Sequence, residues 1–569
     1  MKNLRKVLLP VDIAFLYTVY FLLLLISVYT LACIGFFVGL PVNAFYFPLS
    51  LIVSAVLFFM QLRKKLSLFL TLKHLVFVHL YLLVALCICI YFFDTSYDGL
   101  WYHQPAIIRL AEGWNPVHGP YYLTNQYDAS NYLWIQHYPK ASWTIAACIY
   151  KLTGMVESGK LLNFIVLAAV FCYAYYVLSN LFKQNQFLII AFALLISLSP
   201  VATSQLLSDY LDGILSGMLT LIVLCLLDMQ LSRDFRSLWK WFILATAMII
   251  VSNLKFTGLF MAGIIIAIFS LYWWWKREPV LEIIRRYILI GAFAVVAFVV
   301  FGFNPYVTNV YYKKHIFYPL NEKDKYALII QNQPDVLDGK NNLTQLFISV
   351  FSAAENDMHK PAIKWKNPLT VTRNDIREFA GTDVRLGGLG PVFLLALLVS
   401  LVTLVLFLKE LDKKEKTLLT VILSGIFLSV VLAPMGWWAR YTPQFFLIPV
   451  IISGFAFYAM QKKDMKGFKK FLPRILLILL SLNIVVIAGS NITANVIKTG
   501  LIKKETKELQ ARKDTILINF SKTELQAARK RLQEAGIHFT DCDTLKTNVQ
   551  ELRTIYNLYG LGPVYNKVK

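Results

Sequence analysis

Two carboxylates, a tyrosine and a histidine lie where one of the apolar runs of the sequence ends. Asp94 and Asp98 follow the run, and Tyr102 and His103 come shortly after them. If a helix continued through this stretch, the two carboxylates would share one face, because residues four apart are neighbours on a helix. A carboxylate beside a substrate hydroxyl can accept its proton, so Asp98 and Asp94 are candidate catalytic bases. The plainer alternative is a solvated helix end.

Three basic residues also lie next to apolar runs of the sequence. Lys140 ends the segment His137-Tyr138-Pro139-Lys140, Lys255 separates two short apolar runs, and Arg440 follows a pair of tryptophans. An arginine holds a phosphate through two parallel hydrogen bonds, and a lysine faces it as a point charge. A charge at the bilayer centre costs ~3 kcal/mol, so we place Lys255 at the membrane edge or against a polar cavity. These cations predict a phosphate site, with an interfacial lysine and a tryptophan belt as the alternatives.

Further polar residues would support this chemistry. Asp209 and Asp212 open a later apolar run at a spacing that places both on one helical face. Acidic residues also favour a helix N-terminus electrostatically, which is the competing explanation for this pair. His103, Tyr102 and His137 are expected to assist through hydrogen bonds.

A metal site is compatible with the first cluster. Carboxylates and imidazoles bind divalent ions such as Mg²⁺ or Mn²⁺, and Asp94, Asp98 and His103 would be the ligands. Nothing in their spacing requires the ion, so no cofactor is expected to be essential.

The composition places these residues in a membrane protein. Hydrophobic residues make up 57% and charged residues 16% of the 569 residues, which is too apolar for a soluble domain. A spanning helix needs ~20 apolar residues, and this length criterion predicts about thirteen transmembrane helices in an all-α polytopic fold. The predicted spans are residues 13–38, 45–61, 74–93, 161–181, 187–200, 212–229, 240–253, 258–275, 287–304, 391–408, 417–433, 441–460 and 472–490.

Basic residues orient the chain. Lys2, Arg5 and Lys6 precede the first span, and every connection assigned to the same side by counting carries lysine or arginine. Such residues favour the cytoplasmic side. We therefore predict a transmembrane domain over residues 1–490 with extracytoplasmic loops at about 94–160 and 305–390. Residues 491–569 would form a small extracytoplasmic C-terminal module, α/β or helical, with an amphipathic helix over 522–536.

The formal net charge of +23 does not indicate nucleic acid binding. Topology and anionic lipid headgroups account for the basic cytoplasmic connections, and no nucleic-acid motif is present. The first apolar run is too long for a cleavable signal, so we expect it to remain as a span. The cysteine spacings suggest neither a zinc site nor a disulfide framework.

Three segments resemble the membrane-embedded glycosyltransferases of the GT-C superfamily, especially bacterial aminoarabinose transferases and protein O-mannosyltransferases. They are Asp98-Gly99-Leu100-Trp101-Tyr102-His103, then His137-Tyr138-Pro139-Lys140, and Asn304-Pro305-Tyr306-Val307-Thr308-Asn309 followed by Phe317-Tyr318-Pro319. Arg440-Tyr441 is similar to an arginine segment late in such chains. The resemblance covers roughly the first 460 residues, and the adjacent Asp-Glu pair of several relatives is absent here.

The resemblance implies an inverting transfer of a sugar from a polyprenyl-phosphate donor to an acceptor on the extracytoplasmic side. Asp98 would act as the base, with Asp94, Asp209 or Asp212 as the second carboxylate. Lys140, Arg440 and Lys255 would bind the donor phosphate. The acceptor would be a glycolipid, a glycan or a protein, and the enzyme would lie in a bacterial plasma membrane with its active site facing the periplasm.

Two other classes remain. A transporter or flippase of lipid-linked sugars would favour internal repeats and ionisable groups near mid-membrane, whereas this sequence gathers them at one face. An O-antigen polymerase or ligase would rely on arginines of a late loop, such as Arg373, Arg377 and Arg385.

Overall fold

The apolar runs form long helices in the computed structural model, which describes residues 11–119, 129–182, 185–320, 332–360, 362–463, 465, 467–520, 526–542, 544–545, 549–552 and 564–566. Within these residues, nine helical segments are long and apolar enough to cross a membrane. Helices suit lipid because they satisfy their own backbone hydrogen bonds. The segments contain α1 (Val11–Phe37), α2 (Tyr46–Arg63), α3 (Leu68–Tyr91), α7 (Leu161–Leu181), α10 (Asp212–Ser232), α12 (Phe256–Trp275), α13 (Val280–Val296), α20 (Leu447–Lys462) and α21 (Leu472–Gln510).

The remaining predicted spans are also helices. They are α8 (Gln186–Ser197), α11 (Leu238–Ser252), α18 (Phe393–Leu408) and α19 (Lys413–Val431). The first three are shorter than a typical span, and α19 carries lysines in its first turn. A helix therefore overlaps every predicted span, and the all-α polytopic fold is confirmed.

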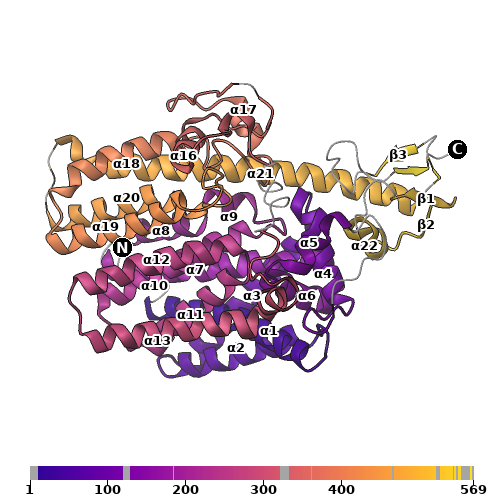
Figure 1. Ribbon diagram of the computed structural model, residues 1–569, viewed down its shortest axis with the longest axis horizontal. Helices are drawn as coiled ribbons and strands as arrows, with labels where there is room; N and C mark the ends of the chain where they lie inside the picture. Colours follow the sequence, from indigo (N-terminus) through magenta and orange to yellow (C-terminus); the bar gives the residue numbers. More distant parts are fainter. Residues whose placement is uncertain are drawn as a thin grey trace.

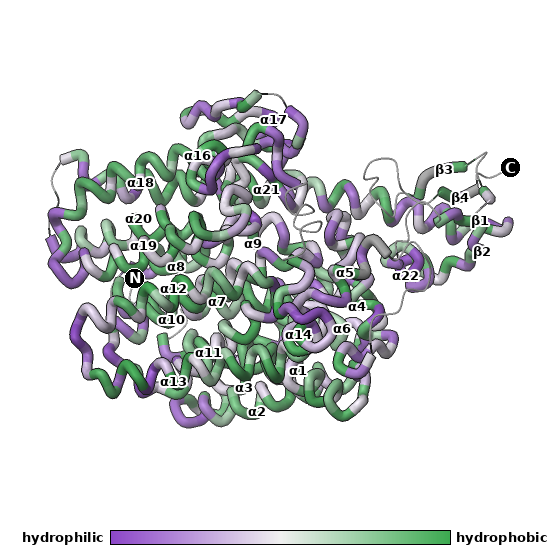
Figure 2. Tube along the Cα trace, viewed as in Figure 1, coloured by the Kyte–Doolittle hydropathy of each residue, from purple (hydrophilic) through white to green (hydrophobic). Residues whose placement is uncertain are grey.

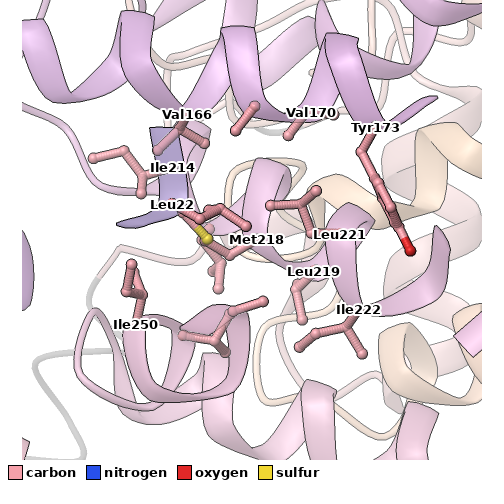
Figure 3. Packing of buried hydrophobic residues seen from close by; sticks show 14 of the residues in the cluster. Leu22, Val166, Val170, Tyr173, Ile214, Met218, Leu219, Leu221, Ile222 and Ile250 are labelled. Atoms are coloured by element: carbon pink, nitrogen blue, oxygen red, sulfur yellow. The ribbon is translucent and has the colours of Figure 1, made fainter. Parts of the chain in front are cut away.

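The core of the bundle is built around α10, which is buried along most of its length. Side chains of α1, α7, α10 and α11 meet there, including Leu22, Val166, Met218 and Ile250 (Figure 3). A β-carbon at Gly217 would lie 2.5 Å from Val166 Cγ1, so glycine permits the close approach of α7 and α10.

The two ends of the bundle differ in character. The short basic connections α2–α3, α12–α13 and α18–α19 lie at one end, here termed the basic end (Figure 1). The opposite loop end carries the described residues of the segments 92–160, 303–392 and 432–446, together with the C-terminal module. Hydrophobic helices occupy the space between hydrophilic segments at the two ends (Figure 2).

Short elements build the loop end. They are η2 (Gly99–His103), α4 (Gln104–Ala111), α5 (Ala129–His137), α6 (Ala141–Thr153), η4 (Val156–Lys160), α9 (Pro200–Ser204), η6 (Phe303–Val307), α14 (Thr308–Lys313), η7 (Asp335–Leu337), α16 (Asn342–Phe351), α17 (Arg373–Glu378) and η8 (Pro443–Phe446). The residues of α6 from Ala141 to Tyr150 are all buried in protein. The helix packs against α1, α2 and α4.

The C-terminal module is a small α/β unit joined to the bundle by one continuous helix. Its strands are β1 (Ile516–Asn519), β2 (Phe539–Asp541), β3 (Val549–Glu551) and β4 (Val564–Asn566), in the order β2-β1-β4-β3, and α22 (Gln526–Glu534) packs beside them. β1 and β2 are parallel, and the other two pairs are antiparallel. The amphipathic helix expected over 522–536 corresponds to α22. The boundary predicted at residue 490 lies inside α21, which runs unbroken to Gln510, so it has to move to the end of that helix.

Candidate active site

A large cavity lies at the loop end of the bundle. Its volume is about 1070 Å³, and it is lined by the segment after α3, the start of α12, residues 380–385, residues 432–441 and α21. Aromatic side chains form much of the wall. The charged residues in its lining are Asp94, Asp98, Lys255, Asp383, Arg385, Arg440 and Lys498.

Arg440 is the centre of a buried ionic cluster in this wall. Its Nη2 atom lies 2.6 Å from Asp98 Oδ2, its Nη1 3.0 Å from Asp383 Oδ2, and its Nε 3.3 Å from Asp212 Oδ2. The guanidinium lies 4.7 Å from the ring centroid of Trp438, whose Nε1 donates to Asp383 Oδ1. Burial raises the pKa of the Asp383 carboxyl, although the charge of Arg440 opposes that rise. Only arginine has enough donors in one plane to meet three carboxylates in this way.

Lys255 provides the second cation of this cluster. It occupies the break between α11 and α12, where the Asn253 side chain donates to the carbonyls of Ile249 and Ala297. The ammonium of Lys255 lies 2.8 Å from Asp212 Oδ1 and 3.5 Å from the centroid of the Tyr441 ring. The prediction that Lys255 faces a polar cavity therefore agrees with the structure. The carboxylate of Asp212 bridges Lys255 and Arg440.

Asp98 presents its carboxylate to the cavity. Its side chain keeps 13% of its exposure although Oδ2 is bonded to Arg440. The backbone N–H of Asp98 points to the Tyr210 hydroxyl at 3.5 Å. A carboxylate that is accessible from a cavity can accept a proton from a hydroxyl bound there.

Asp94 and Asp209 belong to a second, structural cluster. The carboxylate of Asp94 accepts the backbone N–H groups of Ser96 and Asp209, both at 2.8 Å, and Asp94 is 1% exposed. Asp209 Oδ2 accepts from the side chain of Gln104. Burial raises the pKa of both carboxyls, and the charge of Glu157 adds to the rise. The charge of Asp94 also raises the pKa of Asp209. Their bonds hold the backbone in place.

The helix expected to continue through this stretch ends at Tyr91. Asp94 and Asp98 therefore do not share a face: Asp94 contacts the structural cluster, and Asp98 contacts Arg440. A β-carbon at Gly99 would lie 2.1 Å from Asp94 Oδ2, so the turn closes only because residue 99 is glycine.

The predicted metal ligands are not brought together. His103 is 1% exposed, and its Nδ1 accepts a hydrogen bond of 2.8 Å from Trp143 Nε1. Burial lowers the pKa of His103 to about 3, so the imidazole is neutral. In the described part of the chain, no three His, Cys, Asp or Glu side chains form a group that could hold a metal ion. The ring of Tyr102 lies 4.1 Å from that of His103, tilted by 43°, and Tyr102 lines the cavity.

Lys140 and His137 lie away from the cavity lining. The ammonium of Lys140 donates to the carbonyls of Gln136 and Tyr138 within its own turn, and the residue is 2% exposed. Burial lowers the pKa of Lys140 well below its usual value. The prediction that Lys140 binds phosphate is corrected here: its ammonium is used to close the α5–α6 turn.

The same turn joins two of the segments that carry the GT-C resemblance. His137 Nδ1 lies 2.8 Å from Asn309 Oδ1, and the amide of Asn309 donates to the carbonyls of His137 and Tyr318. These segments therefore support one another structurally. The Trp437-Trp438 pair, for which a membrane belt is the alternative, is 2% and 3% exposed and lies inside the protein.

Sequence reasoning misses Asp383 and the role of Tyr210. Asp383 lies in an irregular segment with no apolar run beside it, so nothing local marks it as part of a site. Tyr210 stands between the two predicted carboxylates Asp209 and Asp212, and its ring lies 4.8 Å from the Arg440 guanidinium. That position between two candidate acids is the one signal that points to Tyr210.

Comparison with known proteins finds similarity in structure and none in sequence. No protein-family model and no curated protein sequence matches the chain. The structure is similar to the crystal structure of ArnT from Cupriavidus metallidurans in the apo state, with a TM-score of 0.43 and 11% sequence identity, over 82% of this chain and 85% of that chain. At this level of similarity, the chemistry of the site has to be argued from its own residues.

Proposed function

We propose that this protein is a membrane glycosyltransferase of the GT-C type that transfers a sugar from a polyprenyl-phosphate donor to an acceptor hydroxyl. One observation carries the proposal: Asp98 and the two cations Arg440 and Lys255 face the same cavity at the loop end. A base and a phosphate site side by side are the two components that this transfer needs. The loop end would be extracytoplasmic, facing the periplasm of a bacterial inner membrane, because the opposite end is basic.

The proposed reaction is a single displacement with inversion. The acceptor oxygen forms a bond to the anomeric carbon while the bond from that carbon to the phosphate oxygen breaks. The hydroxyl proton passes to Asp98, and the electron pair of the broken bond leaves with polyprenyl phosphate. General-base assistance of this kind contributes ~100- to 10,000-fold to a rate.

Arg440 and Lys255 would stabilise the charge that develops on the departing phosphate. Before the donor binds, Asp98 holds one of the guanidinium nitrogens at 2.6 Å. A donor phosphate that takes over this nitrogen releases Asp98 for proton transfer. Donor binding and base activation would therefore be one event.

The cavity wall also suits the rest of the donor. Aromatic residues such as Tyr102, Trp438 and Tyr441 offer faces against which a sugar ring can pack. Phe260 on α12 and Leu432 after α19 line the same cavity and are 45% and 53% exposed. Because α12 and α19 pack side by side, these exposed side chains mark an apolar surface along the two helices on which the prenyl chain could lie.

The described residues do not favour a divalent ion as a necessary participant. The three carboxylates around Arg440 are already occupied by a guanidinium, and Lys255 meets the other oxygen of Asp212. We therefore expect transfer to persist in EDTA, with unchanged turnover as the measured result.

The deciding experiment uses purified protein in detergent with a polyprenyl-phosphate sugar and panels of glycolipid, glycan and protein acceptors. Release of polyprenyl phosphate, together with one added sugar mass on an acceptor, supports the proposal. The matched control is Asp98→Asn, which removes the base and little volume. Donor movement across proteoliposome membranes without turnover would instead assign the protein to the transporters.

A second candidate is an O-antigen polymerase or ligase, which one observation favours. Of the late-loop arginines, Arg385 lines the cavity, and its guanidinium lies 5.3 Å from the centroid of Trp438. A further cation would suit a diphosphate donor. Turnover of a polyprenyl-diphosphate glycan, with none of the monophosphate donor, would select this candidate.

A further inference from the structure

The segment that carries the proposed base is also part of the core of the C-terminal module. Leu100 follows Asp98 by two residues and is 1% exposed. Its neighbours in the hydrophobic cluster come from the end of α21 and from the module, and they include Leu509, Ile518, Ala528 and Leu532. The module therefore completes its core with a side chain of the η2 turn.

A buried arginine of α22 holds the other side of the same segment. Arg531 Nη2 donates to the backbone carbonyl of Asp94 at 2.6 Å and to Gln104 Oε1 at 3.3 Å, and it forms an ion pair with Glu157. The side chains of Arg531 and Glu157 are each 2% exposed. Asp98 thus lies between two anchor points, Asp94 and Leu100, that both contact the module.

The charges of the structural cluster make Arg531 necessary there. Glu157 contacts two buried cations, Lys160 and Arg531, while the carboxylates of Asp94 and Asp209 lie in the same cluster. A buried carboxylate that loses its cation is strongly destabilised. Without Arg531, Glu157 would lose one of its two buried cations, and the backbone carbonyl of Asp94 would lose the donor that ties it to α22.

Other contacts of α22 reinforce this docking. The carboxylate of Glu534 accepts the backbone N–H of Val156 at 3.0 Å, one residue before Glu157. At the rim, Lys530 lies 3.4 Å from Glu112, with its side chain 27% exposed. Arg531 is therefore the buried contact of this face and Lys530 the peripheral one.

We propose that the C-terminal module is a positioning element of the active site, with Arg531 as a positioning residue that fixes the segment 94–100 and so aims Asp98 at the cavity. The part that concerns turnover rests on the proposed function, whereas the ordering of the segment does not. The donor-phosphate cations Arg440 and Lys255 come from other elements. The module should therefore control the rate of transfer more than donor affinity.

The test compares full-length Arg531→Gln and Arg531→Lys with the matched control Lys530→Gln from the same helix. Hydrogen exchange of the peptide covering residues 93–103 measures the ordering of the segment directly. We expect exchange there to accelerate at least about tenfold in Arg531→Gln, and to remain unchanged in Lys530→Gln. Arg531→Lys should fall between them, because a lysine keeps the charge but its shorter side chain ends before the position that Nη2 of the arginine reaches.

Turnover gives the second readout. We expect kcat to fall ~10- to 100-fold in Arg531→Gln while the donor KM stays within about threefold, since misplacement of a base affects the chemical step. Active-site titration with bound polyprenyl phosphate corrects for any unfolded fraction. Equal losses of kcat and of binding sites would show a stability defect and overturn the positioning role.

Leu100→Ala and Leu532→Ala test the apolar anchor independently. Each removes an apolar side chain from the same hydrophobic cluster, one on the η2 turn and one on α22. Both should accelerate exchange of residues 93–103. Unchanged exchange in these variants and in Arg531→Gln would overturn the proposal. If the wild-type protein has no transferase activity but its exchange responds as described, the proposed function fails and the positioning of the segment stands.

Discussion

Removing the proposed base should tighten donor binding while it abolishes transfer. Asp98 competes with a donor phosphate for Arg440 Nη2, which it holds at 2.6 Å. Asp98, Asp212 and Asp383 contribute three negative charges, and Arg440 and Lys255 two positive ones, so the cluster is formally −1. Asp98→Asn brings it to zero, which favours a phosphodiester of charge −1.

The size of the effect follows from the bond that is released. A hydrogen bond to a charged group is worth ~1.5–3 kcal/mol net, and the asparagine amide can keep part of it. A gain of ~1.5 kcal/mol corresponds to about tenfold tighter binding. Turnover should fall ~100- to 10,000-fold through loss of the base. Binding of polyprenyl phosphate can be followed by the fluorescence of Trp101 and Trp438, which line the cavity.

Asp383→Asn is the matched control, because it removes another carboxylate from the same guanidinium. It should also tighten binding, but less, since burial already raises the pKa of Asp383. It should keep turnover within about tenfold of wild type because Asp383 is not the base. Equal loss of turnover in both variants, or unchanged affinity in both, would refute the division of roles.

Three further predictions concern other parts of the chain. Lys140→Met should lower the thermal stability without changing the donor KM, whereas Lys255→Met should raise the donor KM, because only Lys255 lines the cavity; the reverse pattern in enzyme kinetics would restore Lys140 as a phosphate ligand. Burial raises the pKa of Glu534 from 4.5 to about 7, so the folded state favours its protonated form; this contribution is complete below pH ~4.5 and is lost as the pH rises to about 7. Thermal unfolding should therefore show wild type losing stability between pH 5 and 8 relative to Glu534→Gln, and parallel pH profiles would contradict it. Cys542 should react with a membrane-impermeant maleimide on intact cells when the other cysteines are replaced, and reaction only after permeabilisation would invert the topology.

The spans can be predicted from sequence because bilayer thickness acts on contiguous residues. Each apolar run of the right length has one favourable structure in lipid, which is why helices overlap the predicted spans. The break at Lys255 is also local, since a charge and an asparagine interrupt two apolar runs. Such local features can be predicted without knowing which residues pack against them in the fold.

The site is less predictable because its side chains are matched across the fold. Lys140 and Lys255 have similar local patterns, yet one bonds to carbonyls of its own turn and the other faces the cavity. Arg440 meets Asp98 from 342 positions away, and Arg531 meets Asp94 from 437. Sequence periodicity carries no information about such pairs. The sequence indicates which residues have suitable functional groups, and the fold determines which of them come into contact.

The length of α21 has a consequence for where the reaction takes place. A helix rises ~1.5 Å per residue, so its 39 residues extend about 58 Å, nearly twice the ~30 Å of the hydrocarbon layer. Asn491, which lines the cavity, lies about 29 Å along the axis from Leu472 at the basic end. If the hydrocarbon layer begins at Leu472, the cavity would be level with the headgroups of the far leaflet, where the phosphate of a prenyl lipid would reside. A donor would diffuse laterally within its leaflet into the cavity and would react while it remains in the membrane. The acceptor would have to approach the membrane surface.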